Sequence, residues 1–348
     1  EMCIRDSGAA GAFEVVDTAA TSPSGLAARE RTIASHLMVL RWAGVEALPP
    51  TKVGVLVTGL RLMAIHAHPD DESSKGAATM AKYAAEGNRV KVVTCTDGRR
   101  GDILNPAMDR PGVLDNLIQV REQEMARAVD ALGVEHEWMG YQDSGLPEGD
   151  PLPPLPEGSF AVQDPVEVAA KLVASIRAFR PHVIITYDEN GGYPHPDHIM
   201  VHTISMLAWE KAGDPEFAPE AGEPWTPLKL YYSHGFILQR MRLLQERLYA
   251  QGKPSPYELM IARWEQNQAD VMSRVTTQVE CGEYFAQREA ALTAHATQID
   301  PAGAFMASSV QDQRDAWPTE EFELAQTRVK THLPEDDLFA GIEEEAAK

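Results

Sequence analysis

From residue 62 onward, short apolar runs alternate with longer amphipathic segments along the chain. Short apolar runs bounded by polar or glycine-containing segments are typical of the buried strands of a parallel sheet. Between them apolar residues recur at helical spacing, as Leu117, Met125, Ala128 and Leu132 do before a predicted helix end at Gly133. The pattern also predicts strands at 62–65, 90–96, 135–139 and 183–186, and helices at 74–86, 166–179 and 197–210.

This alternating order of strands and helices predicts an α/β fold, a Rossmann-like parallel sheet with helices on both faces. The pattern changes after residue 229. One further strand is predicted at 230–233, and the C-terminal part is expected to be mostly helical, with helices at 236–250, 256–268 and 284–297.

Three regions of the chain are expected to differ in order. Residues 1–56 are rich in Ala, Gly, Ser and Thr without a sustained period, and the first residues resemble translated sequencing adapter. We therefore expect a disordered or non-native extension there and a natural start near Val57. Residues 57–334 are expected to form one domain, and 335–348 an acidic frayed tail.

Composition and charge narrow the class of protein. The 348 residues are 44% hydrophobic, which is enough for a sizeable core. Acidic residues outnumber basic ones 52 to 31, so nucleic-acid binding and adhesion to an anionic membrane are not expected, and solubility is the simplest reading of the charge. Three cysteines, no apolar run of membrane-spanning length and no signal peptide favour a cytoplasmic protein.

Two histidine- and aspartate-rich segments, 68–71 and 193–198, directly follow predicted strands. In parallel sheets, ligands bind beyond the carboxyl ends of the strands, so the two segments can share one site. A single His-Pro-Asp segment is more often a turn with a helix cap. The presence of two such segments at strand ends favours a shared metal site.

His68, Asp71 and His198 are the predicted ligands. Two imidazoles and a carboxylate suit Zn(II), one ion per chain, and Fe(II) is possible. Asp70 would remain to take a proton from water acidified by the ion. His195 could stabilise a developing oxyanion or protonate a leaving amine.

Asp197 could orient a ligand imidazole from behind.

The sequence also argues against two other kinds of active site. No Gly-x-Ser-x-Gly elbow supports a serine hydrolase, and no Gly-x-Gly-x-x-Gly follows the first strand to bind a dinucleotide. Core or surface roles are expected for the remaining histidines, namely His66, His182, His202, His234 and His295.

These paired motifs resemble those of the LmbE-like (PIG-L) N-deacetylases, and the resemblance runs from about residue 60 to 329. Segments 63–76, 103–109, 189–193 and 294–300 are similar to family members that hydrolyse mycothiol S-conjugates. The resemblance implies a zinc-dependent amidase that releases a mercapturic acid (an N-acetylcysteine S-conjugate) and glucosaminyl-inositol, and so detoxifies electrophiles. The substrate would be a small molecule.

Two alternatives remain open. One is the N-acetylglucosaminyl-inositol deacetylase of mycothiol biosynthesis, or another deacetylase of N-acetyl sugars on the same scaffold. The other is a binding protein without turnover, against which the presence of Asp70 beside a complete ligand set argues.

By position, the resemblance implies zinc ligation by His68, Asp71 and His198. It makes Asp70 the general base and His195 the imidazole that stabilises the transition state. Tyr193 matches a mobile tyrosine that helps to polarise the carbonyl.

Substrate contacts are implied for three further residues. Arg121 and Asp143 match positions that hold the sugar-inositol part, and Lys75 could read the carbonyls of a bulky acyl group. Arg99 stands where the family usually has an acidic residue, which leaves the sugar contacts of that loop open. No role is derived for His295 and Gln298, and the preferred S-substituent, the metal in vivo and the oligomeric state are open.

Overall fold

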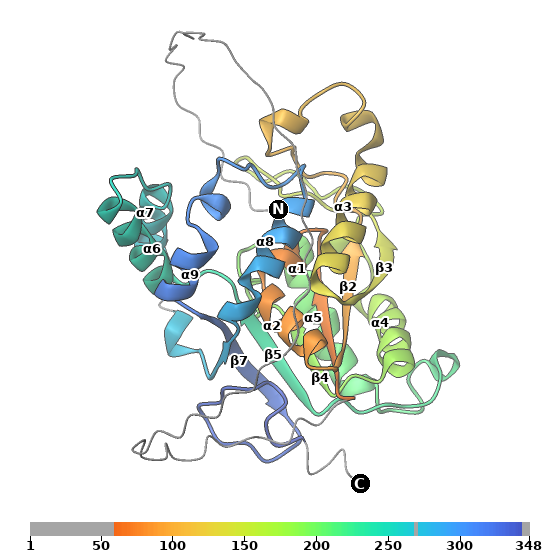
Figure 1. The fold of residues 1–348 in the computed structure, drawn as a ribbon. Coiled ribbons are helices and arrows are strands. Elements are labelled where there is room, and N and C mark those ends of the chain that lie inside the picture. The colour runs from red at the N-terminus through yellow and green to blue at the C-terminus, as the bar shows by residue number, and fades with distance from the viewer. Residues whose placement is uncertain (1–58, 268–270, 343–348) are drawn as a thin grey trace, which may run out of the picture. The chain divides into compact units, whose positions relative to one another are not determined.

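A computed structural model describes residues 59–267 and 271–342 (Figure 1). The predicted extension at 1–56 lies outside the described residues. One sheet of seven strands has the order β3-β2-β1-β4-β5-β7-β6. Its strands are β1 Arg61–His66, β2 Arg89–Thr96, β3 Glu135–Tyr141, β4 Val183–Thr186, β5 Lys229–His234, β6 Thr277–Glu280 and β7 Thr319–Thr327.

Helices cover both faces of the parallel part, which confirms the predicted α/β class. Along β1, Met63 and Ile65 point into one apolar cluster and Leu62 and Ala64 into another. The first cluster includes residues of α4 and α5, and the second includes residues of α2, α3 and α8. These helices are α2 Ala77–Ala85, α3 Leu117–Leu132, α4 Pro165–Phe179, α5 Pro196–Lys211 and α8 Phe285–Ala294.

The strand order reverses between β1 and β4. The chain proceeds from β1 to β2 and β3 on one side, then returns to place β4 against the other side of β1. Because β1 and β4 are parallel neighbours, their carboxyl ends lie at the same edge. Such a reversal is where open α/β sheets bind ligands.

The predicted helix at 74–86 is divided in two. α1 Asp71–Ser74 ends at Lys75, and α2 begins after Gly76, which has φ 81°. A glycine supplies that left-handed backbone at no steric cost, so the chain can change direction between the two helices.

The C-terminal part contains helices α6 Leu238–Ala250, α7 Glu258–Asn267 and α9 Val310–Ala316, but also two strands that the sequence did not predict. β7 pairs antiparallel with β5 and β6. Its acidic residues interrupt the apolar pattern that predicts a strand. The folded chain accommodates them because they form hydrogen bonds and ion pairs. Glu320 accepts the backbone N–H groups of Ala78 and Thr79, and Glu323 binds Arg274.

The predicted frayed tail is wrong for residues 335–342. Glu335 Oε1 lies 2.6 Å from the buried ammonium of Lys229, and Glu335 Oε2 accepts the hydroxyl of Tyr231 at 2.6 Å. Leu338, Phe339 and Ile342 are buried. The tail therefore packs on the sheet, because its acidic residue meets a buried cation and its apolar residues join the core; residues 343–348 lie outside the described residues. Among the described helices, none is long and apolar enough to cross a bilayer.

Candidate metal centre

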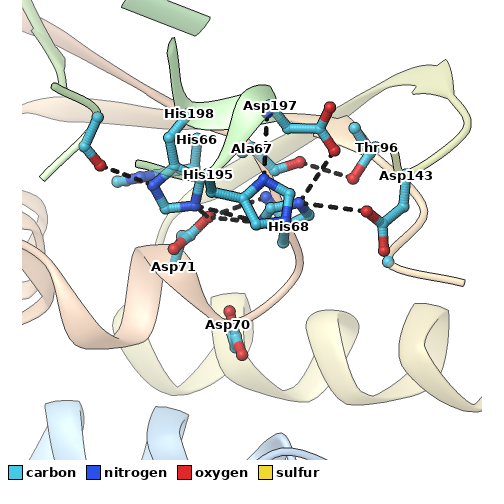
Figure 2. Close-up of polar contacts among 12 residues, drawn as sticks. His66, Ala67, His68, Asp70, Asp71, Thr96, Asp143, His195, Asp197 and His198 are labelled. Carbon is cyan, nitrogen blue, oxygen red and sulfur yellow. Dashed lines mark hydrogen bonds and ion pairs between the residues drawn. The ribbon is translucent and has the colours of Figure 1, made fainter. Parts of the chain in front are cut away.

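The two predicted motifs lie side by side at the point where the strand order reverses. β1 leads into residues 67–70 and α1, which carry His68 and Asp71. β4 leads through a loop to His195, the N-cap of α5, and Pro196 occupies the first helical turn. His198 follows in that turn. Figure 2 shows the three imidazole rings together beside the Asp71 carboxylate.

Three buried ligand atoms form a nearly equilateral triangle. His68 Nδ1 lies 3.5 Å from Asp71 Oδ2, and His198 Nε2 lies 3.4 Å from the same oxygen. The two nitrogens are 3.3 Å apart. Tetrahedral zinc bonds of about 2.0–2.1 Å place neighbouring ligand atoms about 3.3–3.4 Å from each other. The triangle therefore has the dimensions of three vertices of a zinc tetrahedron.

Hydrogen bonds behind the rings fix where each imidazole carries its proton. His198 Nδ1 donates to the carbonyl of Gly191 at 2.8 Å, and His68 Nε2 faces Asp197 Oδ2 at 3.2 Å. In their neutral forms both rings thus turn a lone pair toward Asp71, and these two nitrogens and the carboxylate oxygen can all face one cation. The donor set fits a divalent cation.

Charge in this group is tightly coupled. Burial alone lowers the pKa of His68, but the carboxylates of Asp143, Asp197 and Asp71 outweigh it and raise the pKa well above its usual value. Burial opposes ionisation of Asp71, yet Lys75 holds its pKa well below the usual range. A metal that uses His68 must therefore release a proton from that ring.

Sequence reasoning missed two residues that support the triangle. The hydroxyl of Tyr187 donates to Asp71 Oδ2 at 2.7 Å, and its ring stacks on His198 with centroids 4.3 Å apart. The backbone N–H of Ser144 donates to Asp197 Oδ2 at 2.9 Å. Tyr187 directly follows β4 and Ser144 follows β3 by three residues, so position after a strand was the available signal.

Asp70 stands apart from the linked group. Figure 2 shows its carboxylate with no interaction drawn to the other residues. Its backbone has φ 122° and ψ −23°, a conformation that residues other than glycine rarely adopt. Burial raises the pKa of Asp70, and the neighbouring Asp71 carboxylate adds to the rise. A raised pKa suits a carboxylate that accepts a proton during a reaction.

His195 presents a donor to the same space. Its Nδ1 accepts the backbone N–H of Asp197 at 3.1 Å, so the neutral ring carries its proton on Nε2. Nε2 is buried and has no hydrogen-bond partner among the described residues. Burial lowers the pKa of His195 below its usual value, followed by the effect of His68. A neutral N–H donor suits stabilisation of an oxyanion better than protonation of an amine.

Tyr193 lies on a glycine-containing loop above His198. The two ring centroids are 4.6 Å apart, and Tyr193 is only partly buried. Gly191 in this loop has φ +72°, and an added Cβ would lie 2.6 Å from His198 Cβ. Only glycine fits this close approach, which holds the loop against the His198 ring.

The two residues expected to bind the sugar are buried and held by protein groups. The guanidinium of Arg121 binds the carbonyl oxygens of Gly98 and, at 3.1 Å, Gly101. Asp143 accepts the backbone N–H of Arg100 at 3.0 Å and lies 3.5 Å from His68 Nε2. Arg121 therefore shapes the loop at 97–102, and Asp143 links that loop to His68. Direct contact of either residue with a sugar stays a prediction.

The loop also accounts for Arg99. Its guanidinium is exposed and binds Asp97, with Nε 2.8 Å from Oδ2. The basic side chain at a usually acidic position is thus neutralised by an acidic neighbour two residues before it.

Lys75 lies between a pocket and the metal group, the name used here for His68, Asp71 and His198. Its Nζ is 2.5 Å from Asp71 Oδ1 and 3.2 Å from Ser74 Oγ. The pocket, of about 380 Å³, lies at the carboxyl end of β5. Its lining includes Lys75, Tyr193, Ser233, Phe236, Trp264 and Arg274. The ring centroids of Phe236 and Trp264 lie 5.3 Å apart, and the two rings form an aromatic wall.

Comparison with known proteins finds relatives that are named as amidases or deacetylases. Residues 63–209 match the family model "PIG-L: GlcNAc-PI de-N-acetylase". The chain is 56% identical over 290 residues to a mycothiol S-conjugate amidase of Streptomyces coelicolor, covering 82% of this chain and 99% of that protein. It is 40% identical over 296 residues to a 1D-myo-inositol 2-acetamido-2-deoxy-alpha-D-glucopyranoside deacetylase of Streptomyces scabiei, covering 82% and 90%.

A solved structure supports the fold alone. The N,N'-diacetylchitobiose deacetylase of Pyrococcus horikoshii superposes with a TM-score of 0.50 at 16% identity, covering 76% of this chain and 83% of that chain.

Proposed function

Because this chain belongs to the PIG-L family and is an enzyme that hydrolyses amide bonds, we propose that it cuts mycothiol S-conjugates with one zinc ion. The observation that carries the proposal is the identity over nearly the full relative, 56% to an amidase of these conjugates against 40% to a deacetylase. The products would be an N-acetylcysteine S-conjugate and glucosaminyl-inositol. Buried thiols at Cys95 and Cys281, neither in a disulfide, agree with action in a reducing cytoplasm.

His68, Asp71 and His198 would hold the metal. When bound, it supplies Lewis acidity toward the scissile carbonyl and toward water. Asp70 accepts the proton of the attacking water and returns it to the departing amine as the C–N bond breaks. Nε2–H of His195 donates to the carbonyl oxygen as negative charge develops there, and Tyr193 lies close enough to assist.

The strand order suggests how the substrate lies. The metal group sits over β1 and β4, Arg99 and Asp143 lie beyond the ends of β2 and β3, and the pocket lies at the end of β5. A substrate with its amide at the metal group would extend both ways. The pseudodisaccharide would then lie toward β2 and β3, and the acyl part with its S-substituent would enter the pocket.

We expect Trp264→Ala to raise KM about five-fold for conjugates with an aromatic S-substituent, because an aromatic contact contributes about 1 kcal/mol. Conjugates with a methyl group in its place should change little. Leu259→Ala, an exposed position on the same helix, is the matched control. Steady-state kinetics on the two conjugates checks the prediction, and equal changes for both would contradict it.

We expect Lys75→Ala to lower kcat/KM by about 10–100-fold on both the conjugate and acetyl-glucosaminyl-inositol, since Lys75 acts on Asp71. Lys82→Ala is the control, because that ammonium binds the Glu280 carbonyl instead. A loss confined to the conjugate would show that Lys75 reads the acyl group directly.

The proposed function is tested with two substrates and metal-loaded protein. Hydrolysis of a mycothiol–bimane conjugate should exceed that of acetyl-glucosaminyl-inositol in kcat/KM and should stop when a chelator removes the metal. The reverse preference would favour the deacetylase. Turnover of neither substrate would favour a binding protein.

A further inference from the structure

The unusual backbone of Asp70 requires something to hold it. Residues in sparsely populated regions of φ and ψ cost about 1–3 kcal/mol and persist only where their surroundings determine them. Three described residues other than glycine have positive φ, and the 122° of Asp70 is far from the left-handed values of 59° at Arg180 and 44° at Ala218. The strain thus falls on the proposed base.

Both backbone groups of Asp70 are held. Its carbonyl accepts the N–H groups of Ser73 at 3.0 Å and Ser74 at 3.2 Å, as expected of the N-cap of α1. Its N–H donates to Glu72 Oε2 at 3.0 Å. The second contact is not a backbone hydrogen bond of the helix. The Glu72 side chain therefore helps to hold the unusual backbone conformation of Asp70.

Glu72 is itself fixed by a distant residue. His295, at the end of α8, places Nε2 2.7 Å from Glu72 Oε1. Both side chains are 0% exposed, and Nδ1 of the ring has no hydrogen-bond partner among the described residues. The imidazole therefore directs its one bond at Glu72, and neither side chain can touch a substrate.

The segment that carries His295 is anchored to two other parts of the chain. Thr297 donates its N–H and hydroxyl to Glu124 of α3, at 2.8 and 2.7 Å. Gln298 Nε2 donates to the carbonyl of Asp102 at 2.8 Å. His295 is thereby held rigidly enough to fix another side chain.

Stability alone is a poor reason for this arrangement. Buried charge pairs contribute little to the free energy of folding compared with apolar residues of the same volume. From the geometry we infer that His295 and Glu72 are positioning residues that aim the carboxylate of Asp70, an inference that rests on the proposed role of Asp70 as base. The pair of Glu72 and His295 forms a clamp that links α8 to the backbone of Asp70.

The test uses zinc-loaded full-length protein and the mycothiol–bimane conjugate. Glu72→Gln and His295→Leu should each lower kcat about 10–100-fold, with KM and zinc content unchanged. His295→Gln, which keeps an N–H near the position of Nε2, should recover most of the loss. Glu320→Gln is the matched control, a buried carboxylate that binds backbone N–H groups of α2, and should lower the melting temperature without lowering kcat.

A double-mutant cycle separates positioning from general damage. In an Asp70→Asn background, Glu72→Gln and His295→Leu should lower the residual kcat no further, because the carboxylate they aim is gone. Losses that multiply with that of Asp70→Asn, unchanged kcat in the single variants, or lost zinc would each overturn the inference. Full activity of Asp70→Asn alone would instead overturn the assignment of the base, on which the clamp depends.

Discussion

His198→Ala is expected to reduce the zinc content of the protein from one ion per chain to nearly none and to abolish hydrolysis. The substitution leaves two donors, His68 Nδ1 and Asp71 Oδ2, where a catalytic zinc site needs three protein ligands. Elemental analysis after dialysis against a buffer with trace zinc measures the first effect, and the bimane assay the second.

The same variant should lose its thermal response to zinc. Free zinc at about a thousand times its Kd stabilises a folded protein by about 4 kcal/mol, which corresponds to a rise in Tm on the order of 10 °C. His202→Ala is the matched control, since this ring lies one turn further along α5 and binds the Tyr187 carbonyl. Retained stoichiometric zinc in His198→Ala would disprove the ligand assignment.

Asp70→Asn should lower kcat by about 10²–10⁴-fold, the range that general base catalysis contributes. The amide has the shape of the carboxylate but cannot accept the proton of water. The backbone N–H to Glu72 and the three ligand atoms are untouched, so zinc content and the fold should stay those of the parent protein. Rates near those of the parent, with full zinc, would assign the proton transfer to another group.

The parallel half of the fold is predictable from the sequence because its elements are bounded by clear signals. The runs at 62–65 and 183–186 are continuous apolar segments, and Gly133 ends its helix as expected. β7 and the segment at 335–342 are not predictable in this way. Their acidic residues are paired with cations such as Lys229 and Arg274, and a pattern of polar and apolar letters contains no partners.

In the candidate site, too, the residues that sequence can predict are those whose role depends on near neighbours in the chain. Neighbours in one motif, such as His68 and Asp71, suggest a shared ion through their spacing. Side chains whose role depends on a remote acceptor do not. Arg121, expected at a sugar, binds loop carbonyls, and His295, for which no role was derived, meets Glu72 from 223 residues away.

The place of β7 between β5 and β6 has a consequence for synthesis on the ribosome. Strands β1 to β5 are complete by residue 234, but β5 receives its second neighbour only when 319–327 have emerged. During that interval one edge of β5 is unpaired, and such edges invite association with other chains. Nascent chains stalled in this window should be the ones that chaperones protect.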